Sequence, residues 1–162
     1  MTAPTSAPSP ATPVAPVLNP RLIAVTHYAA RAVLENVLAR HGATFQQSVT
    51  LRLMAVADGP VDREWLVGEV VDALKIDEGA VRTVIGELVE SRLLAAGSAT
   101  ALAITDAGRK LYRTTAAETA PVSARIYAGI PDSDLVTAGR VLSLIHERAN
   151  AELAATAGPG AE

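Results

Sequence analysis

Apolar residues recur at spacings of three and four along most of this chain, a pattern that predicts a mainly helical protein. The first helix is expected over 20–41, with Gly42 as its stop. The second should begin at Thr44, where a reciprocal cap can form. The threonine hydroxyl can accept a hydrogen bond from the Gln47 N–H, and the Gln47 side chain can accept one from the Thr44 N–H. It should end at the Asp-Gly-Pro turn of residues 58–60.

Two shorter helices and a hairpin are predicted next. An aspartate precedes each helix and can cap it: Asp62 before the third helix and Asp77 before the fourth. Two short extended segments follow, at 93–96 and 100–105, with Gly97-Ser98 between them. The second segment alternates large apolar and small residues, as a half-buried strand does, so the pair predicts a small β-hairpin.

Two long helices complete the predicted chain. The fifth should open at Thr105 or Asp106 and run to about Gly129, and Pro121 should kink or interrupt it. The sixth starts in the segment 131–134. Its apolar positions form a seam with alternating spacings of three and four: Leu135, Ala138, Leu142, Ile145, Ala149 and Leu153.

The apolar seam on the last helix needs a partner surface. The other long apolar element is the first helix, 20–41, at the opposite end of the chain. A second copy of the protein would bury both elements. We therefore predict a symmetric homodimer formed through the two ends of the chain, rather than an intramolecular bundle.

The two ends of the chain differ in composition from the middle. Residues 1–20 hold six of the ten prolines and no charge, which predicts a disordered tail over 1–19. The segment 156–162 is predicted to be a second disordered tail. The first tail lacks the basic start and apolar core of a secretory signal, and no apolar run is long enough to span a membrane. We expect a cytoplasmic protein without a membrane partner.

Composition excludes several kinds of chemistry. Cysteine is absent, which excludes disulfides, thiolate zinc sites and a cysteine nucleophile. The three histidines, His27, His41 and His146, are not spaced as metal ligands, so we expect no metal site. No phosphate-binding glycine loop or nucleophile elbow is present, and we expect no cofactor and name no catalytic residue. Abundant alanine and arginine are typical of a GC-rich bacterial genome.

Four short motifs follow one another between residues 44 and 113. They are Asp58-Gly59-Pro60, the run Glu69 to Asp77, the run Leu88 to Leu94, and Thr105-Asp106-Ala107-Gly108-Arg109. With the order of the helices and the hairpin, they resemble the MarR family of bacterial regulators. The resemblance implies a mainly α fold over 20–155: a winged helix-turn-helix lobe with a small β-hairpin wing at 44–113, flanked by N- and C-terminal dimerisation helices at 20–41 and 114–155.

The resemblance also implies a function. Members of this family are homodimeric transcriptional regulators that bind a palindromic operator, with recognition helices in successive major grooves and wings near the minor groove. A small ligand, often aromatic or acidic, binds between the dimer helices and the DNA-binding lobe and changes the lobe spacing. For this chain the resemblance therefore implies a second copy, DNA and a small-molecule effector as partners.

Candidate DNA contacts lie on the exposed face of the fourth helix and after it. Arg82 can donate two hydrogen bonds to a guanine edge, and Thr83 can touch a base or a phosphate. Arg92, Arg109 and Lys110 are candidates for phosphate contacts, although Arg109 and Lys110 could equally be an ordinary solvated helix face.

The charge of this region argues against DNA binding. Residues 60–105 hold eight acidic residues and only four basic ones, and the wing holds no Lys or Arg between Arg92 and Arg109. Phosphate neutralisation dominates affinity for DNA, so a DNA-facing surface with a net negative charge would repel the duplex. The wing is also shorter than is usual in the family.

Six residues are candidates for a ligand site. His27, Tyr28 and Arg31 fall within about one helical turn and together can bind an acidic aromatic compound. Phe45 and Arg52 on the second helix could complete the pocket, and Trp65 could stack on a planar ligand. Packing in the dimer interface is the alternative for the first three, a solvent-facing position for Arg52, and a place in the core for Trp65.

Three functional hypotheses remain open. The first is a ligand-responsive, dimeric DNA-binding regulator. The second is a winged-helix dimer that has lost DNA binding and binds or transforms a small molecule, as a sequestering protein or an enzyme. The third is a protein-interaction module that uses the acidic face of the fourth helix.

Overall fold

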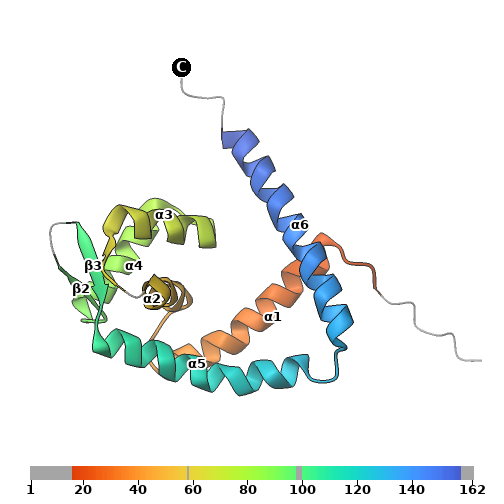
Figure 1. The fold of residues 1–162 in the computed structure, drawn as a ribbon, viewed down its shortest axis with the longest axis horizontal. Helices are drawn as coiled ribbons and strands as arrows, with labels where there is room; N and C mark the ends of the chain where they lie inside the picture. The colour runs from red at the N-terminus through yellow and green to blue at the C-terminus, as the bar shows by residue number, and fades with distance from the viewer. Residues whose placement is uncertain (1–15, 58, 98–99, 158–162) are drawn as a thin grey trace, which may run out of the picture. The chain divides into compact units, whose positions relative to one another are not determined.

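The computed structural model describes residues 16–57, 59–97 and 100–157 (Figure 1). Across these residues the chain is mainly helical, with six helices and one small three-stranded antiparallel sheet. It divides into two compact units between Thr115 and Ala116. Most of the two predicted tails, residues 1–15 and 158–162, lies outside the described residues.

The first two helices begin at side-chain caps. The side chain of Asn19 accepts a hydrogen bond from the backbone N–H of Leu22 at 3.0 Å, and α1 (Pro20–Ala39) follows. α2 (Phe45–Ala57) begins with the predicted reciprocal cap. The N–H of Gln47 donates to the hydroxyl of Thr44 at 3.2 Å, and the N–H of Thr44 donates to the Gln47 side chain at 3.1 Å.

Aspartate caps start the next two helices, as predicted. The Asp62 carboxylate accepts hydrogen bonds from two backbone N–H groups in the first turn of α3 (Arg63–Leu74). Asp77 accepts one in the first turn of α4 (Glu78–Glu90). Lys75 ends α3 in the left-handed conformation, with φ of 52°, and this sharp reversal directs the chain into α4.

The predicted hairpin is part of a larger sheet. β2 (Leu94–Ala96) pairs antiparallel with β3 (Ala101–Ile104), and β3 pairs on its other edge with β1 (Val61–Asp62). The strand order is therefore β1-β3-β2. β1 was not predicted, because a strand of two residues is too short to show an alternating pattern.

One apolar core joins α2, α3, α4 and the sheet. Its buried members share helical or strand spacing on the inner face of each element: Leu51, Met54, Leu66, Val67, Val70, Val81, Ile85, Leu88, Leu94, Leu102 and Ile104. Burying a side chain of this size contributes roughly 1.5–3 kcal/mol relative to exposure. This core holds α3 and α4 together as the two helices of a helix-turn-helix, which we call the α3–α4 turn unit. The opposite face of α4 is left in solvent.

The junction between the wing and α5 (Asp106–Tyr127) is closely packed. The Thr105 hydroxyl donates to the Arg92 carbonyl at 2.8 Å and accepts from the Gly108 N–H at 3.0 Å. A Cβ on Gly108 would lie 2.2 Å from the carbonyl oxygen of Leu93. Only glycine lets the helix approach the strand this closely, which explains the Thr-x-x-Gly pattern.

A kink or an interruption was expected at Pro121; the interruption is wrong, because Pro121 lies inside α5 and the helix continues on both sides of it. Proline removes one N–H donor, but a helix of 22 residues retains its other backbone hydrogen bonds on both sides of that position. The helix ends at Tyr127, and Gly129 follows with φ of 78°.

The second unit contains the end of α5 and all of α6 (Asp132–Ala157). α6 extends two residues into the predicted second tail. Between residues 116 and 156 no side chain is buried within the single chain. The exposed side chains include several large apolar ones, among them Ile126, Val136, Leu142, Leu144, Ile145 and Leu153. None of the helices in the described part of the chain combines the length and apolar character needed to cross a membrane.

Candidate nucleic-acid interface and ligand cavity

The outer face of α4 carries the residues predicted to face DNA. α4 buries Val81, Ile85 and Leu88 in the core, and its opposite side exposes Glu78, Gly79, Arg82, Thr83, Glu87 and Glu90. The polar residues on this face determine what the helix can bind. Arg82 is the only basic residue within α4.

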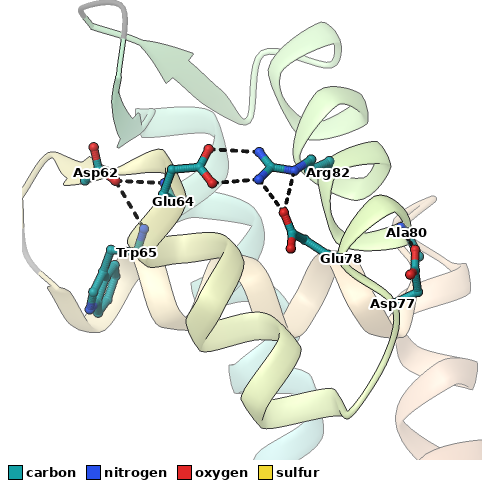
Figure 2. Close-up of polar contacts among 7 residues, drawn as sticks. All are labelled: Asp62, Glu64, Trp65, Asp77, Glu78, Ala80 and Arg82. Atoms are coloured by element: carbon teal, nitrogen blue, oxygen red, sulfur yellow. Dashed lines mark hydrogen bonds and ion pairs between the residues drawn. The ribbon is translucent and has the colours of Figure 1, made fainter. Parts of the chain in front are cut away.

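Two carboxylates surround the guanidinium of Arg82 (Figure 2). Nη1 and Nη2 donate two parallel hydrogen bonds to Oε1 and Oε2 of Glu64 in the first turn of α3, at 2.8 and 2.6 Å. Nε and Nη2 both donate to Oε1 of Glu78, one turn earlier on α4, with the Nε contact at 3.0 Å. Figure 2 shows the three side chains meeting between the two helices, with Trp65 turned away from them.

Electrostatics in this cluster favour the charged forms. Hydrogen bonds from Arg82 lower the pKa of the Glu64 carboxyl below its ordinary value, and this effect exceeds the opposing effect of desolvation. Hydrogen bonds to Glu64 and then Glu78 raise the pKa of Arg82 above its already high value. The pairing therefore stabilises the charged forms of Glu64 and Arg82 together.

Two other residues of the α4 face have partners of their own. The Thr83 hydroxyl donates to the carbonyl of Gly79 at 3.0 Å, so only its oxygen lone pairs remain to accept a hydrogen bond from another group. The Glu87 carboxylate accepts a hydrogen bond from the Gln47 side chain at 2.9 Å. Gln47 thus caps α2 and also links it to α4.

The remaining predicted DNA contacts lie around the base of the wing. Arg92 leaves α4 with φ of 60°, a left-handed backbone that arginine rarely adopts, and its side chain is exposed. Arg109 is half-buried and Lys110 is exposed, both in the first turns of α5. The Thr105 hydroxyl bonds to the Arg92 carbonyl and so ties the end of α4 to the start of α5.

A cavity of about 190 Å³ lies among α1, α2 and the end of α3. Three of the six predicted ligand residues line it: His27 and Arg31 from α1, and Phe45 from α2. The guanidinium carbon of Arg31 lies 4.5 Å from the centre of the Phe45 ring, in a cation–π arrangement. Arg31 Nε also donates to Glu35 at 2.8 Å.

The other three predicted ligand residues do not line this cavity. Tyr28 packs edge-on against the His27 ring, with ring centres 5.8 Å apart, and is 66% exposed. Arg52 is exposed on α2. Trp65 is 45% exposed in the first turn of α3, so the alternative that placed it in the core is wrong.

Sequence reasoning missed four residues that line the cavity: Gln46, Ala73, Leu74 and Ile76. Gln46 belongs to the start of α2, Ala73 and Leu74 to the end of α3, and Ile76 to the turn that follows α3. Their spacing indicated ordinary helix packing, and no local signal showed that they would face α1. The apolar side chains of Ala73, Leu74 and Ile76 and the Gln46 amide give the cavity a mixed lining, together with one aromatic ring, one imidazole and one guanidinium.

Comparison with known proteins identifies the fold through structure alone. No protein-family model matches the sequence, and no curated protein matches it either. Solved structures do match, and they are MarR-family transcriptional regulators that align with about four fifths of this chain. One is MarR from Staphylococcus aureus in complex with salicylate and kanamycin, at 19% identity and a TM-score of 0.70, covering 82% of this chain and 90% of that one.

Two further structures align as well. A protein from Listeria monocytogenes, described as a MarR-family regulator and solved with a 26mer DNA, is 20% identical with a TM-score of 0.69, covering 88% of this chain and 96% of that one. CouR from Rhodococcus jostii RHA1 bound to p-coumaroyl-CoA is 20% identical with a TM-score of 0.65, covering 77% and 88%. The chain therefore has the MarR-like winged-helix fold.

Proposed function

We propose that this chain is a dimeric, DNA-binding transcriptional regulator of the MarR type whose DNA binding responds to a small acidic aromatic ligand. The observation that carries the proposal is the α3–α4 turn unit, which exposes the α4 face with Arg82 and Thr83 in a fold shared with a regulator solved on DNA. In this proposal α4 enters the major groove and these two side chains reach the base edges.

Phosphate contacts are assigned to the base of the wing. Arg92, Arg109 and Lys110 sit where α4 ends and α5 begins, and the Thr105 hydrogen bonds hold these two points together. Cations at fixed positions beside a recognition helix set its register on the duplex without reading sequence. Each phosphate contact adds to the salt dependence of binding, and because one copy supplies few cations, the proposed affinity also requires a second copy of the protein.

The cavity beside α1 is assigned to the ligand. Arg31 supplies a planar guanidinium for a carboxylate, Phe45 supplies an aromatic face, and the His27 imidazole can donate or accept a hydrogen bond. Tyr28 extends the aromatic surface next to His27. Salicylate and p-coumaroyl-CoA, present in the structures of two of the similar proteins, are both aromatic and carry an acidic group.

The dimer is assigned to the two ends of the chain. Leu142, Ile145 and Leu153 on the predicted seam are between 39% and 52% exposed in the single chain. Apolar side chains that repeat along a long helix and stay exposed are typical of an interface with another chain. Two copies would also present two recognition helices, as a palindromic operator requires.

The test is fluorescence anisotropy with two DNA probes, sheared genomic DNA and the region upstream of the gene, at a low and a moderate salt concentration. Tight binding to the upstream region that weakens steeply with salt is the expected result. A ligand screen with salicylate then follows on the protein–DNA complex. Absence of binding to either probe at low salt would overturn the proposal.

A second candidate is favoured by one observation, the excess of carboxylates around the only arginine of α4. It is a winged-helix dimer that has lost DNA binding and binds or transforms a small molecule in the α1 cavity. Absence of DNA binding, together with tight binding of an aromatic acid, would favour this candidate. A shared fold is compatible with both functions.

A further inference from the structure

We propose that Glu64 competes with DNA for Arg82. While Glu64 is bound, the guanidinium of Arg82 cannot make a two-point contact with a base, and we call this the closed arrangement. This proposal rests on the proposed function, because it concerns how the same helix would read DNA. It assigns Glu64, a residue of α3 rather than of the recognition helix, a direct part in controlling affinity for DNA.

The argument begins with the donors of Arg82. A guanidinium carries five N–H donors. Two of its edges each present a pair of donors that can bind two acceptors at once. Glu64 occupies the edge formed by Nη1 and Nη2, and Glu78 occupies the edge formed by Nε and Nη2. Four of the five donors are thus taken, and the one left on Nη1 cannot form a two-point contact.

Reading a guanine requires two donors on one edge. Guanine presents two acceptors, O6 and N7, in the major groove, and no other base presents two. Arg82 can therefore replace one carboxylate by a guanine, but it cannot hold both carboxylates and a guanine at once. In the closed arrangement the three side chains carry a net negative charge toward the DNA, which repels phosphates.

Glu64 and Glu78 differ in how they can be released. Glu78 is one turn away from Arg82 on the same helix, so both travel together into any groove. Glu64 belongs to a different helix and reaches Arg82 across the α3–α4 contact, with a side chain that is 64% exposed. Release of Glu64 alone frees the edge formed by Nη1 and Nη2 without altering the recognition helix.

The test compares four variants with the wild type in an anisotropy assay on fluorescein-labelled sheared genomic DNA at low salt. They are Glu64→Gln, Arg82→Ala, the double variant with both changes, and Glu69→Gln as the control. Glu69 is an exposed carboxylate on α3 five residues further along, so its variant removes the same charge from a different side of the same helix. Thermal unfolding of each variant checks that the lobe stays folded.

The expected result is an increase in affinity of about fivefold for Glu64→Gln, well above that for Glu69→Gln, because freeing Arg82 adds one DNA contact. In the Arg82→Ala background the same change should raise affinity no more than Glu69→Gln does. An increase that persists without Arg82 would overturn the proposal, since Glu64 would then act only through its charge.

The outcomes also separate this proposal from the proposed function. If the wild type binds DNA and Glu64→Gln matches Glu69→Gln, competition for Arg82 is overturned and the regulator function stands. If neither the wild type nor any variant binds, both are overturned. An NMR measurement without DNA adds an independent readout: rotation about the Arg82 Nε–Cζ bond should be slow in the wild type and faster in Glu64→Gln.

Discussion

Arg82 of α4 donates two parallel hydrogen bonds to Glu64 of α3, a residue eighteen positions earlier in the chain. This pairing changes the meaning of the acidic excess in the lobe. The carboxylates of Glu64 and Glu78 are gathered on a single arginine, and Glu87 is bound to Gln47. The excess is therefore organised around specific partners, and it acts on the residue that would read DNA.

The Glu64–Arg82 pair predicts a pH dependence of stability. Because folding lowers the pKa of Glu64, the pair stabilises the fold fully above the ordinary glutamate pKa of about 4.3, and this contribution is lost as the pH falls through the lower folded value. The difference in melting temperature between the wild type and Glu64→Gln should be constant from roughly pH 5 to 8 and shrink below about pH 4. A difference that grows on acidification would contradict the assignment.

Most of the fold could be predicted because the signals are local. The caps formed by Thr44, Asp62 and Asp77 depend on side chains within three residues of the backbone groups they bind, and all three are present. β1 was missed because its strand exists only through pairing with β3, forty residues away. Pro121 does not interrupt α5, because the other hydrogen bonds of a long helix outweigh one missing bond.

The candidate sites could be predicted only in part, because their geometry depends on contacts between elements. Helical spacing placed Arg82 on the exposed face of α4, but only the α3–α4 packing brings Glu64 to it. Spacing along α1 likewise grouped His27 and Arg31, whereas the turn after α3 supplies Ile76 to the same cavity. Trp65 carried no pattern that could tell an exposed position from a buried one.

Two substitutions of Arg92 separate the role of its side chain in DNA binding from the strain of its left-handed backbone. Arg92→Ala and Arg92→Gly both remove the guanidinium, so both should weaken DNA binding to the same extent and reduce its salt dependence. Glycine also relieves the strain at φ of 60°, so Arg92→Gly should be more stable than Arg92→Ala by about 1 kcal/mol. Urea unfolding and anisotropy on the same two proteins measure both effects. Equal stabilities would contradict the left-handed conformation.

The contact of Gly108 with Leu93 predicts a large response to a single methyl group. A Cβ at this position would lie 2.2 Å from the Leu93 carbonyl oxygen and 2.9 Å from the Ile104 side chain. Gly108→Ala should therefore destabilise the lobe by about 1–3 kcal/mol in urea unfolding at fixed protein concentration. Gly68→Ala on α3 is the matched control, because its Cβ meets nothing within 4 Å and it should stabilise by about 0.5–1 kcal/mol.

The cavity beside α1 predicts which arginine binds an aromatic acid. Arg31 lines the cavity and Arg52, on the outside of α2, does not. With salicylate as the probe, Arg31→Gln should weaken binding about tenfold in calorimetry, because it removes a charge-assisted contact to the carboxylate. Arg52→Gln should leave binding within a factor of about two, the size of a screened long-range charge effect. Equal losses in the two variants would place the ligand elsewhere.

The exposed seam of α6 predicts where a dimer can be broken. Leu142 belongs to the seam and is 44% exposed, whereas Val136 lies off the seam on the same helix and is 72% exposed. Leu142→Glu places a charge in the proposed interface, where it has no partner, so light scattering after size exclusion should report a monomer. Val136→Glu adds the same charge to the same helix and should remain dimeric. If both variants dissociate, or neither does, the seam is not the interface. If only Leu142→Glu dissociates, its affinity for DNA should fall as well, because two recognition helices would no longer be joined in one dimer.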